Sequence, residues 1–219
     1  ASTIATATIL LNSVSEAFPT GLANRSGHLG RNLIDHVMGG GAFGIFPGYL
    51  DKYYYGRKPA GFYIPRFRNH TEDAPDFVRG YGFQGIASRL GWSARSAQPG
   101  LGEDFKNGLR TPGPWVVYCA GFGEILPNYE NHVRLHPNRT DKDGLPVPIL
   151  DAKIGENEEK LIAQMSKDSV EMLQTAGCIG ARLLEFGGNE GSYTFGNAIH
   201  EMGTARMGHD PATSVLNKW

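Results

Sequence analysis

Residues His200 to Gly208, near the end of the chain, read His-Glu-Met-Gly-Thr-Ala-Arg-Met-Gly. A histidine titrates near neutral pH, so a well-placed imidazole can accept a proton from an alcohol. The glycines beside it let the backbone pass close to a flat cofactor, because glycine has no Cβ. A lone histidine beside a glycine turn is more often structural. The whole pattern is more specific than that, and it predicts an active-site segment with His200 as the proton acceptor.

A second group of residues that could bind a cofactor lies near the start of the chain, where residues 30–36 read Gly-Arg-Asn-Leu-Ile-Asp-His. Both segments resemble, in the same order, segments of the glucose-methanol-choline (GMC) oxidoreductases, which are flavoenzymes that oxidise alcohols. Residues 30–36 are similar to the flavin lid of the family, and residues 200–208 are similar to its carboxy-terminal active-site segment. Residues 1–13 are similar to the helix before the lid, and residues 210–217 to the stretch after the histidine.

The resemblance implies oxidation of an alcohol with FAD as the cofactor. In such a reaction the hydroxyl proton leaves to a base while the carbinol hydrogen moves as hydride to the flavin. The base must therefore lie within about 3 Å of the hydroxyl. His200 occupies the position of that base in the resembled segment. The residues expected to contact the cofactor are Gly30, Asn32, Asp35, His36 and Thr204.

Three residues leave alternatives open. Asn32 and Asp35 could cap a local turn by bonding to backbone instead of contacting flavin, although the second motif favours flavin contact. Glu201 stands where a proline often follows the histidine in the family, and its carboxylate could point into the site or into solvent. In the family a second active-site residue, histidine or asparagine, comes further downstream, and the chain has no segment that corresponds to it.

Composition and charge exclude several other classes of protein. The chain has 219 residues, of which 40% are hydrophobic and 20% charged, with a net charge of -1, and this is typical of a soluble globular protein. Without a basic block a nucleic-acid partner is not expected, and no apolar run approaches the roughly 20 residues of a membrane-spanning helix. Cys119 and Cys178 are expected to be buried thiols, with one disulfide as the alternative. No histidine has metal-ligand spacing with cysteine or carboxylate, so no metal is predicted.

Strand-like segments dominate the middle of the chain, and one long helix follows them. The helix is predicted over 157–176, where apolar residues keep helical spacing, glutamates begin it and Gly177 can end it. Asp-Lys-Asp-Gly at 141–144 is a strong turn signal and predicts a hairpin. Strands without regular strand-helix alternation predict an α+β fold, a mostly antiparallel sheet packed with helices. The predicted strands are 61–68, 77–86, 115–122, 131–135, 146–150 and 179–186, and 91–114 is predicted to be a surface loop with one short helix around 103–109.

A dinucleotide-binding turn would need Gly-x-Gly-x-x-Gly between a strand and a helix. Residues 39–44 match it literally, but Pro47 and Gly48 prevent a helix from starting there, so a glycine-rich strand or its entry loop is predicted. The site for the adenine and pyrophosphate of FAD is therefore not expected in this chain, which is interpreted as an internal fragment. Residues 1–36 and 196–219 are expected to be strips of the FAD domain, and residues 37–195 the substrate-binding domain.

The substrate is expected to be an alcohol, sugar or polyol, because the His200 segment resembles the bacterial sugar and polyol branch of the family more than its choline or aryl-alcohol branches. Some members of that branch work with a small subunit or a cytochrome as electron acceptor, others with oxygen, and the residues do not discriminate between these. Bacterial periplasm and cytoplasm both remain open. The alternative hypothesis is a non-catalytic carbohydrate-binding or interaction module of the same fold. Aromatic residues that could stack on a sugar are Phe62, Tyr63, Phe67, Tyr81, Phe83 and Trp92.

Overall fold

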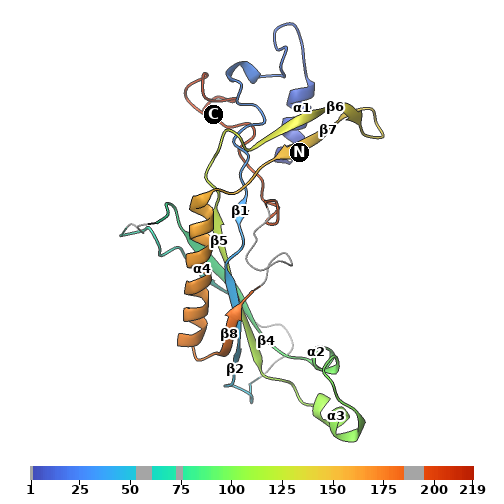
Figure 1. Cartoon of the computed structure of the whole chain (residues 1–219), viewed down its shortest axis with the longest axis vertical. Coiled ribbons are helices and arrows are strands. Elements are labelled where there is room, and N and C mark those ends of the chain that lie inside the picture. Colours follow the sequence, from blue (N-terminus) through green and yellow to red (C-terminus); the bar gives the residue numbers. More distant parts are fainter. Residues whose placement is uncertain (1, 53–60, 73–75, 185–194) are drawn as a thin grey trace. The chain divides into compact units, whose positions relative to one another are not determined.

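The computed structural model describes residues 2–52, 61–72, 76–184 and 195–219 (Figure 1). The chain divides into two compact units. Unit 1 contains Ala1–Val37, Glu124–Glu159 and Thr194–Trp219, and unit 2 contains Met38–Gly123 and Lys160–Tyr193. Unit 1 thus contains both predicted site segments. The assignment of residues 37–195 to a substrate-binding domain stays a prediction.

Unit 2 is built on an antiparallel sheet with the strand order β3-β4-β5-β2-β8. Its long central pair is β4 and β5, in which Phe83 lies opposite Gly121. The predicted glycine-rich strand is present as β2, next to β5. The bounds of these strands are Gly41–Phe46 for β2, Gly61–Ile64 for β3, Tyr81–Arg89 for β4, Trp115–Glu124 for β5 and Ile179–Leu183 for β8.

One long helix, α4 (Glu156–Thr175), packs its later turns on one face of this sheet. Met165 is fully buried against Gly40 and Gly121, where a Cβ on either glycine would collide with its side chain. The helix begins with three glutamates, which suit the positive end of the helix dipole. It ends before Gly177, whose φ of +89° continues the chain in the left-handed region. The predicted helix is therefore confirmed, together with its stop signal.

Unit 1 contains the predicted hairpin, formed by the antiparallel strands β6 (His132–Thr140) and β7 (Pro146–Asp151). The helix α1 (Thr3–Asn12) packs beside it, and Ser2 caps this helix by accepting a hydrogen bond from the Ala5 N–H at 3.5 Å. A buried cluster of Ala7, Leu33 and Val133 joins the helix, the predicted lid and the hairpin. Apolar packing therefore holds the lid between two regular elements. Unit 1 also contains the short 3-10 helix η1 (Asn24–Ser26) and β1 (His36–Val37).

The α+β class is confirmed, because antiparallel sheets occur together with helices. The predicted surface loop 91–114 contains two short helices, α2 (Trp92–Ser96) and α3 (Gly102–Leu109), of which only α3 was expected. The last predicted strand, 179–186, extends into residues that the structure does not describe. Both cysteines are free and buried, as expected. Within the described ranges, no helix is both long enough and apolar enough to cross a membrane.

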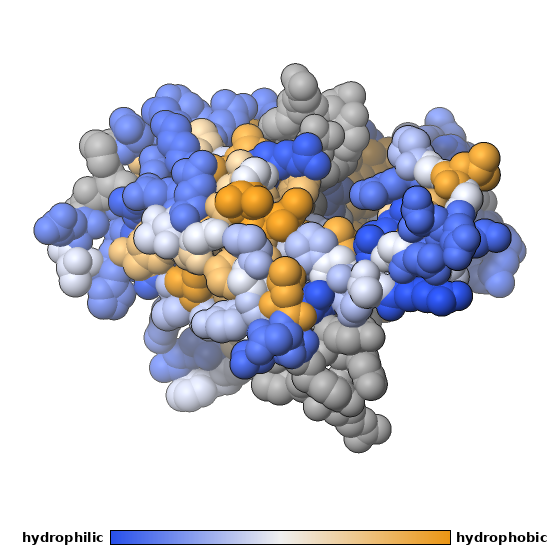
Figure 2. Space-filling view, turned by 90° about the horizontal axis from the view of Figure 1, so that it is seen from below, coloured by the Kyte–Doolittle hydropathy of each residue, from blue (hydrophilic) through white to orange (hydrophobic). Residues whose placement is uncertain are grey.

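The surface carries exposed apolar side chains between hydrophilic ones, seen as orange among blue (Figure 2). Among the aromatic residues considered for sugar stacking, Tyr81 and Phe83 are 1% and 0% exposed and belong to the core. Tyr63 and Trp92 are 66% and 67% exposed. Tyr63 and Trp92 are therefore accessible for stacking on a sugar, whereas Tyr81 and Phe83 are not.

Candidate active site

The predicted lid and the predicted active-site segment lie side by side in unit 1. Ile34 and Met202 form an antiparallel bridge in which each N–H donates to the carbonyl oxygen of the other residue, at 3.0 and 2.9 Å. On its other side the lid pairs with the start of β6, where the Val133 N–H donates to the Gly30 carbonyl at 2.8 Å. The structure thus brings together two segments that are far apart in the sequence.

Two glycines make this close pairing possible. Gly30 has a φ of +81° and Gly203 a φ of +98°, and both values lie in the region that favours glycine. A Cβ on Gly30 would collide with the carbonyl oxygen of Val133, and a Cβ on Gly203 with that of Asn32. In this structure the two glycines therefore allow the lid to approach its protein neighbours.

The side chains of Asn32 and Thr204 point into the unit and are 6% and 1% exposed. The Asn32 Nδ2 lies 3.2 Å from a ring nitrogen of His28, and its backbone has a φ of +56°. The Thr204 hydroxyl donates to the Thr3 carbonyl at 3.2 Å, while its own carbonyl accepts from the Gly30 N–H at 2.7 Å. Thr204 therefore links the His200 segment to the backbone of α1 and of the lid, and the Asn32 side chain contacts the His28 ring.

Asp35 joins the two predicted site segments through a single oxygen. Its Oδ1 accepts hydrogen bonds from the backbone N–H of His36 at 2.7 Å and from that of His200 at 3.0 Å. The residue is 1% exposed, and its Oδ2 is buried without a hydrogen-bond partner among the residues described. Sequence reasoning grouped Asp35 with the lid but missed its bond to the His200 segment.

The imidazole rings of His36 and His200 meet edge to face, with centroids 5.1 Å apart and an interplanar angle of 87°. His200 is exposed and His36 partly exposed. The preceding residue, Ile199, has a φ of +54°, which is unusual for a β-branched side chain. Such strained conformations cluster at functional sites, where surrounding contacts hold them. No signal in the sequence indicated this backbone geometry.

The main chain of Glu201 is also fixed, because its carbonyl accepts a hydrogen bond from the Thr3 hydroxyl at 2.6 Å. Helix α1 therefore contacts the active-site segment directly through its first residue. The side chain of Glu201 is neither fully buried nor fully exposed.

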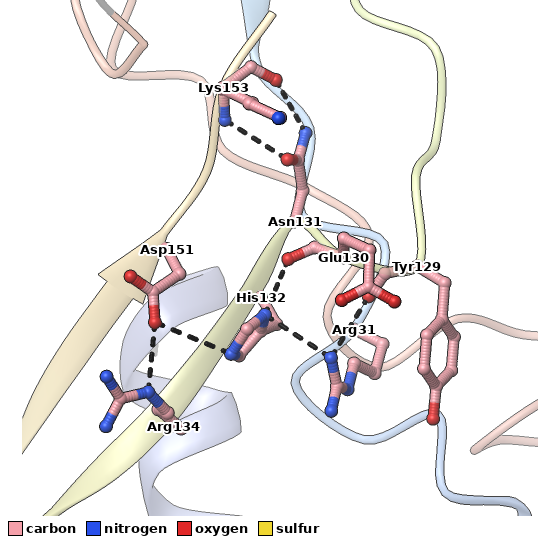
Figure 3. Close-up of polar contacts among 8 residues, drawn as sticks. All are labelled: Arg31, Tyr129, Glu130, Asn131, His132, Arg134, Asp151 and Lys153. Carbon is pink, nitrogen blue, oxygen red and sulfur yellow. Dashed lines mark hydrogen bonds and ion pairs between the residues drawn. The ribbon is translucent and has the colours of Figure 1, made fainter.

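A polar network ties the lid to the hairpin (Figure 3). Arg31 lies over the ring of Tyr129, with 4.5 Å from the guanidinium carbon to the ring centroid. His132 places Nδ1 at 2.6 Å from the Glu130 carbonyl oxygen and Nε2 at 3.6 Å from Asp151 Oδ2. The Arg31 Nη1 lies 3.3 Å from the same Nδ1 of His132, so the guanidinium group of the lid meets the first residue of β6. This network holds Arg31 of the lid against the start of β6.

Known proteins resemble the chain over its whole length. The family model described as GMC oxidoreductase matches residues 127–219. The 2-methyl-1,2-propanediol dehydrogenase of Mycolicibacterium austroafricanum is 32% identical over 232 residues, which cover 100% of this chain and 39% of that protein. The large subunit of fructose dehydrogenase from Gluconobacter japonicus is 28% identical over 99% of this chain and 38% of its own length. Paromamine 6'-oxidase of Streptomyces fradiae is 36% identical over 42% of this chain and 16% of its own length.

The chain spans about two fifths of the length of the first of these relatives. The residues of the lid and of the His200 segment resemble GMC oxidoreductases, and the matches to known proteins agree with that resemblance. Residues 127–219 match the GMC oxidoreductase family, and the whole chain is similar to proteins named as dehydrogenases.

Proposed function

We propose that the whole protein is an FAD-dependent oxidoreductase that oxidises a CH–OH group of an alcohol, with His200 as the base. The observation that carries this proposal is the pairing of the lid with the His200 segment, which sets the His200 ring beside His36 with centroids 5.1 Å apart. His200 is exposed, so a substrate hydroxyl can reach its imidazole. A fixed backbone with an accessible imidazole is the arrangement that general-base catalysis needs.

The contribution of the chain is to take the proton and to orient the hydroxyl. In this role the His200 imidazole accepts the hydroxyl proton, while the Asp35 carboxylate holds the backbone N–H of His200. FAD supplies the acceptor for the hydride of the carbinol carbon. The main chain of Glu201 is anchored to Thr3, so the residue after the base cannot shift without breaking that bond.

The lid residues fit a cofactor-contact role through their backbone. Asn32, Asp35 and Thr204 are buried within unit 1, so their side chains hold the lid in shape. His36 is partly exposed at the end of the lid and is the side chain that would meet the flavin, together with the backbone that starts at Gly30. In this proposal residues 1–36 and 196–219 belong to the FAD domain, and residues 37–195 form the substrate-binding domain.

The substrate is a sugar or a polyol. Two of the similar proteins are named for a diol and for fructose, and a third, similar over 42% of this chain, is named for paromamine. One relative is a large subunit by name, which supports an electron-accepting small subunit or cytochrome as a partner of this protein too.

Anaerobic mixing of the FAD-loaded whole protein with candidate substrates tests the proposal. The panel contains short diols, hexoses, polyols and aryl alcohols, and bleaching of the oxidised flavin is followed by absorbance. We expect the flavin to be reduced by a diol, sugar or polyol. Failure of every CH–OH compound to reduce the flavin, together with calorimetric binding of a sugar, would show a binding module instead.

A further inference from the structure

The bond between Asp35 and His200 spans 165 positions of the sequence and ends on the backbone of the residue proposed as the base. The same oxygen also accepts the N–H of His36 at 2.7 Å. One carboxylate oxygen therefore fixes the main chain of both histidines whose rings meet edge to face. Both bonds end on backbone N–H groups, so through them Asp35 acts on the backbone of the two histidines.

The conformation before His200 needs such support. Ile199 is 77% exposed and holds a φ of +54°, so burial of its own side chain does little to fix it. The next backbone N–H, that of His200, is the one that Asp35 binds. Strained backbone persists only where surrounding contacts over-determine it. The Asp35 bond, with the anchored carbonyl of Glu201 one residue further on, supplies those contacts.

We propose that Asp35 is a positioning residue for His200, holding the His36 and His200 backbones on one oxygen so that the His200 ring keeps its place beside the His36 ring. This inference rests on the proposed role of His200 as the base. It differs from a flavin-contact role, because the Asp35 side chain is 1% exposed and both donors on Oδ1 are protein amides.

A double-mutant cycle tests whether Asp35 acts through His200. The rate of flavin reduction and the KM for substrate are measured for the wild type, Asp35→Ala, His200→Ala and the double variant of the FAD-loaded whole protein. We expect Asp35→Ala to lower the rate about tenfold or more, with KM changed less than about twofold, since small displacements of a base are costly. In the His200→Ala background the same substitution should change the rate less than about twofold.

Two further variants separate positioning from a general loss of structure. Asp35→Asn keeps an oxygen acceptor and should retain the rate within about threefold. Asp141 is the matched control, because its Oδ1 also accepts two backbone N–H groups, from Asp143 at 2.9 Å and Leu145 at 3.0 Å, in the hairpin turn. Asp141→Ala should leave the rate unchanged. If Asp35→Ala does not fold, Asp35→Ser replaces it in the cycle. The shorter serine hydroxyl still offers an acceptor at this position but cannot reproduce both hydrogen bonds of the carboxylate.

Amide hydrogen exchange gives a readout that does not depend on activity. Exchange in a peptide that covers residues 197–203 should accelerate in Asp35→Ala and stay near the wild-type rate in Asp141→Ala. An equal rate loss from Asp35→Ala in both backgrounds, or unchanged exchange in the peptide 197–203, would overturn the positioning role. Near-normal turnover of His200→Ala alone would remove the base assignment and this inference with it, whereas failure of the cycle alone would leave the base assignment standing.

Discussion

Arg68 and Asp168 form a bidentate ion pair inside unit 2. The Arg68 Nε donates to Asp168 Oδ2 at 2.9 Å, and its Nη2 donates to Oδ1 at 2.7 Å. The Tyr81 hydroxyl donates to Oδ2 at 2.6 Å, and Gln164 donates to Oδ1 at 2.8 Å. Both carboxylate oxygens of a 4% exposed residue on α4 are therefore fully used, and they fasten the helix to β4 and to the segment after β3.

Removal of this carboxylate should destabilise the protein. Asp168→Ala leaves the Tyr81 hydroxyl without its acceptor and breaks the bond to Arg68, whose side chain is 41% exposed and can partly rehydrate. We expect a loss of roughly 2–3 kcal/mol in the free energy of unfolding, somewhat less than for a fully buried pair. Urea unfolding measures this. The matched control is Asp151→Ala, which breaks a half-exposed pair with Arg134 and a longer contact with His132, and it should cost less than about 1 kcal/mol. An equal loss in both variants would contradict the structural role given to Asp168.

The same carboxylate should make stability depend on pH on the acid side. Burial alone would raise the pKa of Asp168, but hydrogen bonds from Arg68, Tyr81 and Gln164 together hold this pKa below its usual value. A carboxyl with a lowered pKa contributes stability above its unfolded pKa of about 4, and that contribution is lost as the pH falls through the folded pKa. The difference in unfolding free energy between wild type and Asp168→Asn should therefore shrink from about pH 6 to about pH 3. A constant difference would contradict the pairing.

The glycine at 203 should tolerate no side chain. Gly203→Ala adds a Cβ that collides with the Asn32 carbonyl oxygen at a backbone φ of +98°. Gly144 lies in the hairpin turn with a φ of +81°, and a Cβ added there has no atom within 4 Å. Gly144→Ala therefore measures the free-energy cost of the backbone conformation without a collision. We expect about 1–2 kcal/mol of destabilisation for Gly144→Ala and about 3 kcal/mol or more for Gly203→Ala. Thermal or urea unfolding compares the two variants, and equal losses would mean that the lid does not lie against residue 203.

Helices and turns that have a local sequence pattern were predicted correctly. The hairpin followed from Asp-Gly at 143–144, and α4 from helical spacing with a glycine stop, because turns and amphipathic helices are encoded by neighbouring residues. Strand β4 begins at Tyr81 and not at Phe77, since Arg79 has a φ of +72° and the chain turns there. The helix α2 was missed because five residues are too short to show a period.

The candidate site was predictable as two segments but not as an arrangement. The types of residue at Asp35, His36 and His200 are visible in the sequence, and a family resemblance puts them in one enzyme. The bond from the His200 N–H to Asp35 and the edge-to-face rings depend on how distant segments pair. The positive φ of Ile199 has no sequence signal, because isoleucine is among the residues least suited to it. Such features belong to tertiary structure alone.

The role of His200 as the base is the central claim, and the rate of flavin reduction by the best substrate in the whole FAD-loaded protein tests it most directly. We expect His200→Ala to lower this rate about 100-fold or more, the usual scale for loss of a general base. His136→Ala serves as the control, because the His136 Nδ1 accepts the Asn138 and Arg139 N–H groups within the hairpin. That variant should keep the wild-type rate. A His200→Ala protein that binds FAD and reduces it at a near-normal rate would contradict the account.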